Sequence, residues 1–132
     1  MKTAAFAVLS AVTLSLGACA PGAQNLPAPD WLNADAPVQE GWIRVTGEEF
    51  RLYRDQNDLR RGPAVACVSG ALPQNAQRAA GDLTGGKVRV FGRTTEWSGR
   101  DGAQTLNWQG SRINNGCGRA VVILADRVEV IR

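Results

Sequence analysis

Short runs of alternating apolar and polar residues begin near residue 41 and continue to the end of the chain. In residues 42–46 the apolar Ile43 and Val45 fall on one side, and residues 49–53 alternate in the same way. A period of two is typical of a strand that buries one face. Similar runs, bounded by Gly, Pro, Asn or Asp, predict further strands. These cover residues 64–72, 87–97, 105–109 and 119–131.

Residues 73–83 form the segment that we expect to be helical, because Pro73 suits a helix start and Gly81 a helix end. Gly92 predicts a bulge or a sharp bend in its strand, and a break is expected at residues 125–126. The order is then three strands, a short helix and three strands. The fold class is therefore mainly β, a small antiparallel barrel or sandwich with one short helix.

The N-terminal residues follow a different pattern. Lys2 gives a positive start, and residues 4–16 then contain no charge, glycine or proline. A transmembrane helix needs about 20 apolar residues, so this run is too short to span a membrane. It has the length of the hydrophobic region of a signal peptide, and small residues follow it.

Residues 16–19, Leu-Gly-Ala-Cys, resemble the lipobox of bacterial lipoproteins, and the resemblance covers residues 1–20. It implies cleavage before Cys19, a diacylglyceryl group on the Cys19 thiol and fatty acylation of the new amino group. Several acyl chains anchor a protein stably, whereas a single chain gives marginal binding. The implied location is the cell envelope, facing the periplasm or the cell surface. The residue after Cys19 is Ala20. An aspartate there would favour retention in the inner membrane, so alanine favours the outer membrane.

An ordinary secretory signal, with Cys19 free or disulfide-bonded, is the alternative to lipidation. In either case the chain divides into a signal peptide (1–18), a tether (19–40) and a β domain (41–132). Four of the six prolines lie between residues 20 and 40, which predicts an extended linker. Trp31 and Leu32 interrupt this linker, and we expect them to pack back on the domain; an exposed anchor for a partner or the bilayer interface is the other interpretation.

Two stretches of the body resemble OB-fold domains. The sequence GGKVRVFGR at residues 85–93 is similar to their fourth strand with its entering turn, and VVILADRVEVI at 121–131 is similar to their closing strand. The resemblance implies an OB-like barrel. Other small barrels and sandwiches produce similar patterns, so they remain alternatives.

If Cys19 is lipidated, Cys67 and Cys117 are the two cysteines that remain to be assigned. An exported protein sits in an oxidising compartment, so a disulfide between them is the expected state. Such a bridge would contribute about 4 kcal/mol in the chain-entropy model. Two free buried thiols, or a metal held by two cysteines, are the alternatives.

Composition excludes several kinds of chemistry. The chain has no histidine, which excludes a Ser-His-Asp triad, a Cys-His pair and a His-ligated zinc within it. Its 15 basic and 12 acidic side chains are nearly balanced, so we expect no nucleic-acid partner. We also expect no cofactor and no metal. The basic residues are almost all arginine, which suits phosphate or carboxylate recognition but also follows from codon bias.

Acidic side chains are the remaining candidates for catalysis, as a carboxylate pair of the kind used in glycoside hydrolysis. Glu48 and Glu49 are adjacent, so in a strand they would point to opposite faces and not converge. Asp55, Asp58 and Glu96 are interpreted as surface charges, and residues 55–58 as a turn that lacks the glycine and glutamate of a calcium loop.

Candidate ligand-binding residues fall in two regions. Tyr53 and four arginines crowd residues 51–62 and could face an anion or a polysaccharide, although a solvated hairpin is the alternative. Trp97 sits at the edge of the polar loop 98–104, where a ligand could stack on it. Trp42 and Trp108 are expected to pack in the core. The four arginines are Arg51, Arg54, Arg60 and Arg61.

The sequence thus predicts a lipid-anchored cell-envelope protein whose β domain is a non-catalytic binding or scaffolding module. Its expected partners are the membrane, through the anchor, and an envelope protein or polysaccharide. The alternatives are a carboxylate-dependent cell-wall hydrolase and a small periplasmic inhibitor or folding factor.

Overall fold

A computed structural model describes residues 25–62, 66–97 and 105–131. The predicted signal peptide, Cys19 and the loop 98–104 lie outside the described residues. The elements follow in the order β1 (Val38–Thr46), β2 (Glu49–Tyr53), α1 (Gln56–Arg61), β3 (Cys67–Ala71), α2 (Gln74–Ala80), β4 (Lys87–Glu96), β5 (Leu106–Trp108), β6 (Ser111–Ile113) and β7 (Val121–Val130).

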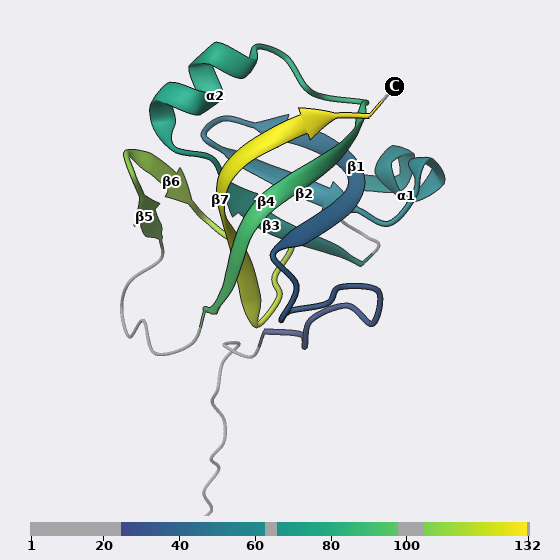
Figure 1. Ribbon diagram of the computed structural model, residues 1–132. Helices are drawn as coiled ribbons and strands as arrows, with labels where there is room; N and C mark the ends of the chain where they lie inside the picture. Colours follow the sequence, from purple (N-terminus) through teal and green to yellow (C-terminus); the bar gives the residue numbers. More distant parts are fainter. Residues whose placement is uncertain (1–24, 63–65, 98–104, 132) are drawn as a thin grey trace, which may run out of the picture.

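Five strands close into a barrel in the order β1-β2-β3-β7-β4, with β4 pairing back to β1 (Figure 1). All neighbours are antiparallel except β3 and β7, which are parallel. Strands β5 and β6 form a separate two-stranded hairpin. The predicted mainly β fold is confirmed, as a barrel and not a sandwich. The parallel β3–β7 pair departs from the antiparallel arrangement that was predicted, and the OB-like form stays a prediction.

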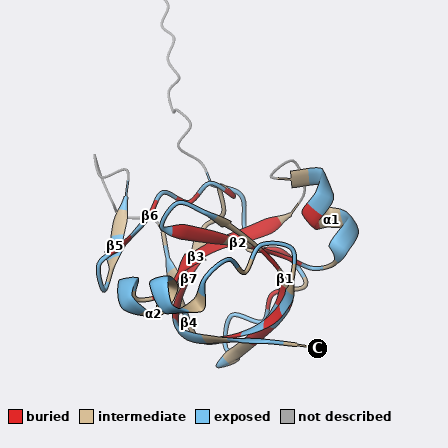
Figure 2. Cartoon of the chain, turned by 90° about the horizontal axis from the view of Figure 1, so that it is seen from above, coloured by how far each residue is buried: buried red, intermediate tan, exposed pale blue. Residues whose placement is uncertain are grey.

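Alternation along the strands fills the barrel. Ile43 pairs with Leu52 across β1 and β2, and both side chains are fully buried. Val68, Val88 and Ile123 bring the other three strands into the same cluster. Figure 2 shows buried residues along the barrel strands, whereas the two helices are largely exposed. Because the five strands close into a barrel, the alternating apolar residues have one interior to face.

The predicted irregularity at Gly92 is confirmed as a bulge. Phe91 pairs with Arg127 and Gly92 with Ala125, so Asp126 is the extra residue between them. The break expected at residues 125–126 is thus a bulge inside a continuous β7. A Cβ on Gly92 would lie 2.3 Å from the backbone oxygen of Leu124, so the close approach of β4 and β7 requires glycine there.

Helix α2 lies within the predicted range and ends at Gly81, where φ is 71°. Helix α1 replaces the turn or hairpin that was expected. Asp55 caps it, because its side-chain oxygen accepts a hydrogen bond of 2.9 Å from the backbone N–H of Asp58. Gly62, with φ of 76°, ends the helix after six residues. The residue before the helix and the one after it therefore set its length.

Residues 25–37 differ from the extended linker that was expected, because they pack on the barrel. Leu26 forms a β-bridge with Arg119, and the Gly92 N–H donates to the carbonyl of Pro37 at 3.0 Å. Leu32 is 8% exposed within the main core cluster, and Trp31 packs against that cluster. The expected packing of this pair on the domain is confirmed. Burial of Leu32 explains why this proline-rich segment does not remain apart.

Cys67 and Cys117 form the predicted disulfide, with an S–S distance of 2.04 Å and Cα atoms 5.5 Å apart. The bond joins β3 to the connection between β6 and β7, across a sequence separation of 50. Within the described part of the chain, no helix has the length and apolar character needed to cross a membrane.

Candidate functional site

The connection between β4 and β7 returns across the outer face of β2 and β3. We call its residues 111–118 the strap. Phe50 and Leu52 of β2 face the interior, so Glu49 and Arg51 face outward, toward the strap. Hydrogen bonds from strap amides to Glu49 and Ser69 hold the strap over this face.

The carboxylate of Glu49 holds the middle of the strap. It accepts hydrogen bonds from the backbone N–H groups of Asn114, Asn115 and Gly116, the last at 2.8 Å. Glu49 is only 4% exposed. Asn115 adopts a φ of 60°, and its side-chain amide donates to the carbonyl of Arg119 at 2.7 Å. Successive amides that converge on one anion form a nest, so Glu49 fixes the curvature of this connection.

The two ends of the strap are also attached. The Cys117 N–H donates to the buried Ser69 Oγ at 3.0 Å, beside the disulfide. At the other end, the Arg112 N–H donates to Glu48 Oε1 at 2.8 Å. Glu48 and Glu49 therefore bind different peptide groups of the same segment. They serve as two attachment points rather than as a facing carboxylate pair.

The structure does not bring the four predicted arginines together. The guanidinium of Arg51 lies against Gly116 of the strap, and its buried Nε has no hydrogen-bond partner among the described residues. Arg54 and Arg61 lie at α1 and share the partly buried Asp58, at 3.7 and 3.9 Å, while both arginine side chains are exposed. Such pairs contribute roughly 0–1 kcal/mol. Arg60 is an exposed residue of the same helix. A role in ligand binding stays a prediction for all four.

Among the described acidic residues, Asp55 is the one whose pKa clearly departs from its usual value. Its pKa lies below the usual value, first because the backbone N–H of Asp58 donates to the carboxylate and then because Arg54 is close. Desolvation opposes this shift. The perturbation thus belongs to a helix cap, and residues 55–58 form the first turn of a helix instead of an isolated turn.

Trp97 is half-buried and packs with Trp108 against a small cluster that includes Ile113. Its backbone N–H donates to the Ala120 carbonyl at 2.8 Å. Trp108 Nε1 donates to a carbonyl of β7 at 2.7 Å. Trp42 packs against the cluster around the disulfide. Core packing is confirmed for Trp42 and Trp108, and ligand contact by Trp97 remains a prediction.

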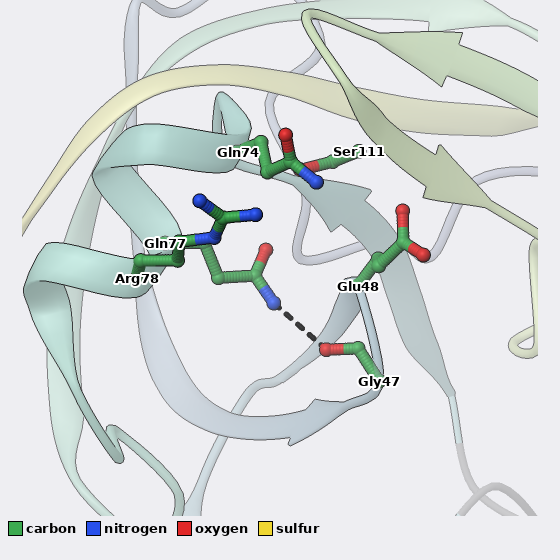
Figure 3. Close-up of a pocket in the computed structure, with 6 residues that line it drawn as sticks. All are labelled: Gly47, Glu48, Gln74, Gln77, Arg78 and Ser111. Atoms are coloured by element: carbon green, nitrogen blue, oxygen red, sulfur yellow. Dashed lines mark hydrogen bonds between the residues drawn. The ribbon is translucent and has the colours of Figure 1, made fainter.

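A cavity of about 200 Å³ opens beside the strap, between the β1–β2 turn, α2 and the start of β6 (Figure 3). The Gln77 side chain reaches across it, and its Nε2 donates a hydrogen bond to the Gly47 carbonyl at 2.8 Å. Sequence patterns did not single out this site, except that Glu48 was considered as a catalytic candidate. Its lining residues are Gly47, Glu48, Gln74, Gln77, Arg78 and Ser111.

Two polar atoms in this cavity lack partners. Ser111 is 1% exposed, and neither its Oγ nor Gln77 Oε1 has a hydrogen bond among the described residues. A buried polar group left without a partner costs roughly 1–3 kcal/mol, so both atoms favour a polar ligand. Exposed side chains of opposite charge, Arg78 and Glu48, lie on either side of them (Figure 3). This cavity is the strongest candidate site in the described part of the chain.

The described residues include no cluster of three or more acidic or cysteine side chains that could hold a metal ion. The cavity instead offers hydroxyl, amide, guanidinium and carboxylate groups, which recognise a ligand through hydrogen bonds and charge. Comparison with protein-family models, curated proteins and solved structures gives no match to this chain.

Proposed function

We propose that this protein is a lipid-anchored binding module of the cell envelope, and that its barrel takes a ligand in the cavity beside the strap. The cavity carries the binding part of the proposal, because Ser111 Oγ and Gln77 Oε1 are buried there with no hydrogen-bond partner in the part of the chain that the structure describes. The disulfide and the Glu49 contacts hold the strap, and with it Ser111, in one position. A site preorganised in this way loses little entropy when it binds.

The anchor part of the proposal comes from the lipobox-like residues 16–19. Acyl chains on Cys19 would place the barrel in the periplasm or at the cell surface, with the outer membrane favoured. The partners would then be the membrane and an envelope protein or polysaccharide.

A binding role is favoured over a carboxylate hydrolase by the partners of the acidic candidates. Glu48 and Glu49 accept backbone N–H groups of the strap, at Arg112 and at residues 114–116. Asp55 caps α1, and Asp58 pairs with arginines of the same region. A hydrolase needs one carboxyl group to deliver a proton and a second to act on the other side of the bond. These four side chains already have structural roles.

Metabolic labelling with a fatty-acid probe tests the anchor. The wild-type chain should carry the label, and Cys19→Ser should lose both the label and membrane association. Unlabelled wild-type protein would refute the anchor while leaving the binding site untouched.

Thermal unfolding in the presence of fractionated envelope components tests the binding role. We expect one fraction to raise the melting temperature of the wild type but not that of Ser111→Ala, and Arg89→Gln, at an exposed arginine of β4 outside the cavity, should behave as the wild type. A fraction that acts equally on Ser111→Ala would place binding elsewhere. Release of soluble fragments from cell wall, abolished by Glu48→Gln or Asp58→Asn, would replace the binding role with the hydrolase.

A further inference from the structure

The cavity beside the strap carries opposite charges on its two sides, and this limits the kind of ligand that it can bind. Arg78 of α2 approaches from one side and Glu48 of the β1–β2 turn from the other, with the amides of Gln74 and Gln77 between them (Figure 3). Arg78 has no ion pair among the described residues. Glu48 uses Oε1 to accept the Arg112 N–H at 2.8 Å, which leaves Oε2 for another donor.

The orientation of Gln77 is fixed by its neighbour. A carbonyl can only accept, so the Gln77 amide must turn its NH₂ group to the Gly47 carbonyl, 2.8 Å away. Its Oε1 is then left without a partner among the described residues, and it can only accept. The ligand must therefore present an N–H or O–H donor at this position.

Ser111 supplies the complementary group. Ser111 as a residue is 1% exposed, its Oγ has no hydrogen-bond partner in the described ranges, and the hydroxyl can donate to an acceptor. Ser111 and Arg78 together provide donors for a carboxylate, whereas Glu48 and Gln77 provide acceptors for an ammonium group. Glu48 would repel an anion that has no ammonium group, and Arg78 would repel a cation that has no carboxylate.

The size and the lining of the cavity favour a small ligand over a larger or flat one. Pockets for drug-sized molecules measure roughly 300–1,000 Å³, whereas this cavity measures about 200 Å³. Its six lining residues include no aromatic ring on which a sugar or a nucleobase could stack. The ligand should then be small and held by charge and hydrogen bonds.

We propose that this cavity binds the zwitterion of a small free α-amino acid, with its carboxylate on Arg78 and Ser111 and its ammonium group on Glu48 and Gln77. This inference rests on the proposed binding function but is independent of the lipid anchor. It names a ligand class for the site: a small molecule whose ammonium and carboxylate groups are attached to the same carbon atom.

Calorimetric titration of the full chain in detergent micelles with alanine tests the proposal. We expect saturable binding of alanine. Alanine amide, which lacks the carboxylate, and N-acetylalanine, which lacks the ammonium group, should each bind at least about tenfold more weakly. Glucose should not bind. Equal binding of alanine and either derivative, binding of glucose instead, or no binding of alanine would each overturn the proposal.

Variants locate the binding. Arg78→Gln and Glu48→Gln should each weaken alanine at least about tenfold, and Arg89→Gln, at an exposed arginine of β4 outside the cavity, is the matched control. Glu48→Gln keeps an oxygen for the Arg112 N–H, so the strap should stay in place, as an unchanged melting temperature would verify. If an envelope fraction stabilises the protein through Ser111 but alanine does not bind, the amino-acid inference fails and the proposed function stands.

Discussion

Glu49→Gln is the substitution that most directly tests how the strap is held. The glutamate carboxylate serves three backbone N–H groups, at residues 114, 115 and 116, from a position that is 4% exposed. Glutamine has nearly the same shape, so it removes the charge and one acceptor without opening a cavity. The change therefore isolates hydrogen bonding from packing.

The expected loss of unfolding free energy follows from the change in the acceptor of each backbone N–H group. Oε1 serves Asn114 and Asn115, and a glutamine oxygen could still accept from both, without the charge. Hydrogen bonds to charged groups contribute about 1.5–3 kcal/mol, against about 0.5–1.5 for neutral ones. The Gly116 N–H would face an NH₂ group and lose its acceptor altogether. Removal of a buried charge recovers some desolvation energy, so we expect a net loss of roughly 2–3 kcal/mol.

Guanidinium unfolding followed by tryptophan fluorescence at neutral pH measures this loss, with the disulfide intact. Glu48→Gln is the control, because Glu48 is exposed and its replacement keeps an acceptor for Arg112; it should change the unfolding free energy by less than about 0.5 kcal/mol. Amide exchange at residues 114–116 should accelerate in Glu49→Gln alone. Unfolding free energies that agree for the two variants, with unchanged exchange, would refute the anion-nest interpretation.

Three further outcomes follow from the fold. Replacing Cys67 and Cys117 by alanine should lower the unfolding free energy by up to about 4 kcal/mol, given their separation of 50 residues; a loss below about 1 kcal/mol would contradict the chain-entropy estimate. Because the folded pKa of Asp55 is depressed, its stabilisation should be complete above the ordinary value of 3.8 and be lost as the pH falls through the folded pKa. Asp55→Asn keeps a cap without this titration, so the stability difference between wild type and variant should shrink in acid; a constant difference would contradict the assignment. Gly92→Ala should cost roughly 1–3 kcal/mol, because the new Cβ would meet the Leu124 carbonyl, and an unchanged melting temperature would contradict this close approach.

Strand prediction succeeded where the barrel has a single interior to fill. The range predicted for β2, residues 49–53, is the observed strand, because Phe50 and Leu52 have no other apolar environment to enter. The bulge at Gly92 was also predictable, since a glycine inside an alternating run marks either a bend or a close approach. Local pattern and tertiary packing agree at these positions.

The sequence did not predict α1, β6 or the packing of residues 25–37. In these segments the local sequence signals were weak, or tertiary contacts overrode them. Helix α1 has six residues and a single buried side chain, Leu59, so it shows no apolar period. Its signal was the Asp55 cap followed by Gly62. Strand β6 has three residues, and its buried Ser111 reads as a turn residue. Residues 25–37 show no apolar periodicity and contain few large apolar side chains, yet burial of Leu32 helps to hold them on the barrel.

The candidate cavity was not predictable from local sequence because its walls come from three segments separated by many residues: 47–48, 74–78 and 111. No spacing rule connects a turn glutamate, two helix glutamines and a strand serine. Only the barrel, which places the β1–β2 turn beside α2, and the strap, which carries Ser111 to both, bring these groups together (Figure 3).

Stability and binding are linked in this arrangement through the strap. Ser111 begins the strap, and the Glu49 contacts and the disulfide hold the residues that follow it. A ligand that bonds Ser111 only in the closed strap must stabilise that closed form by RT ln(1 + [L]/Kd). Conversely, a substitution that loosens the strap, such as Glu49→Gln, should weaken the ligand although it touches no lining residue, because linkage is reciprocal.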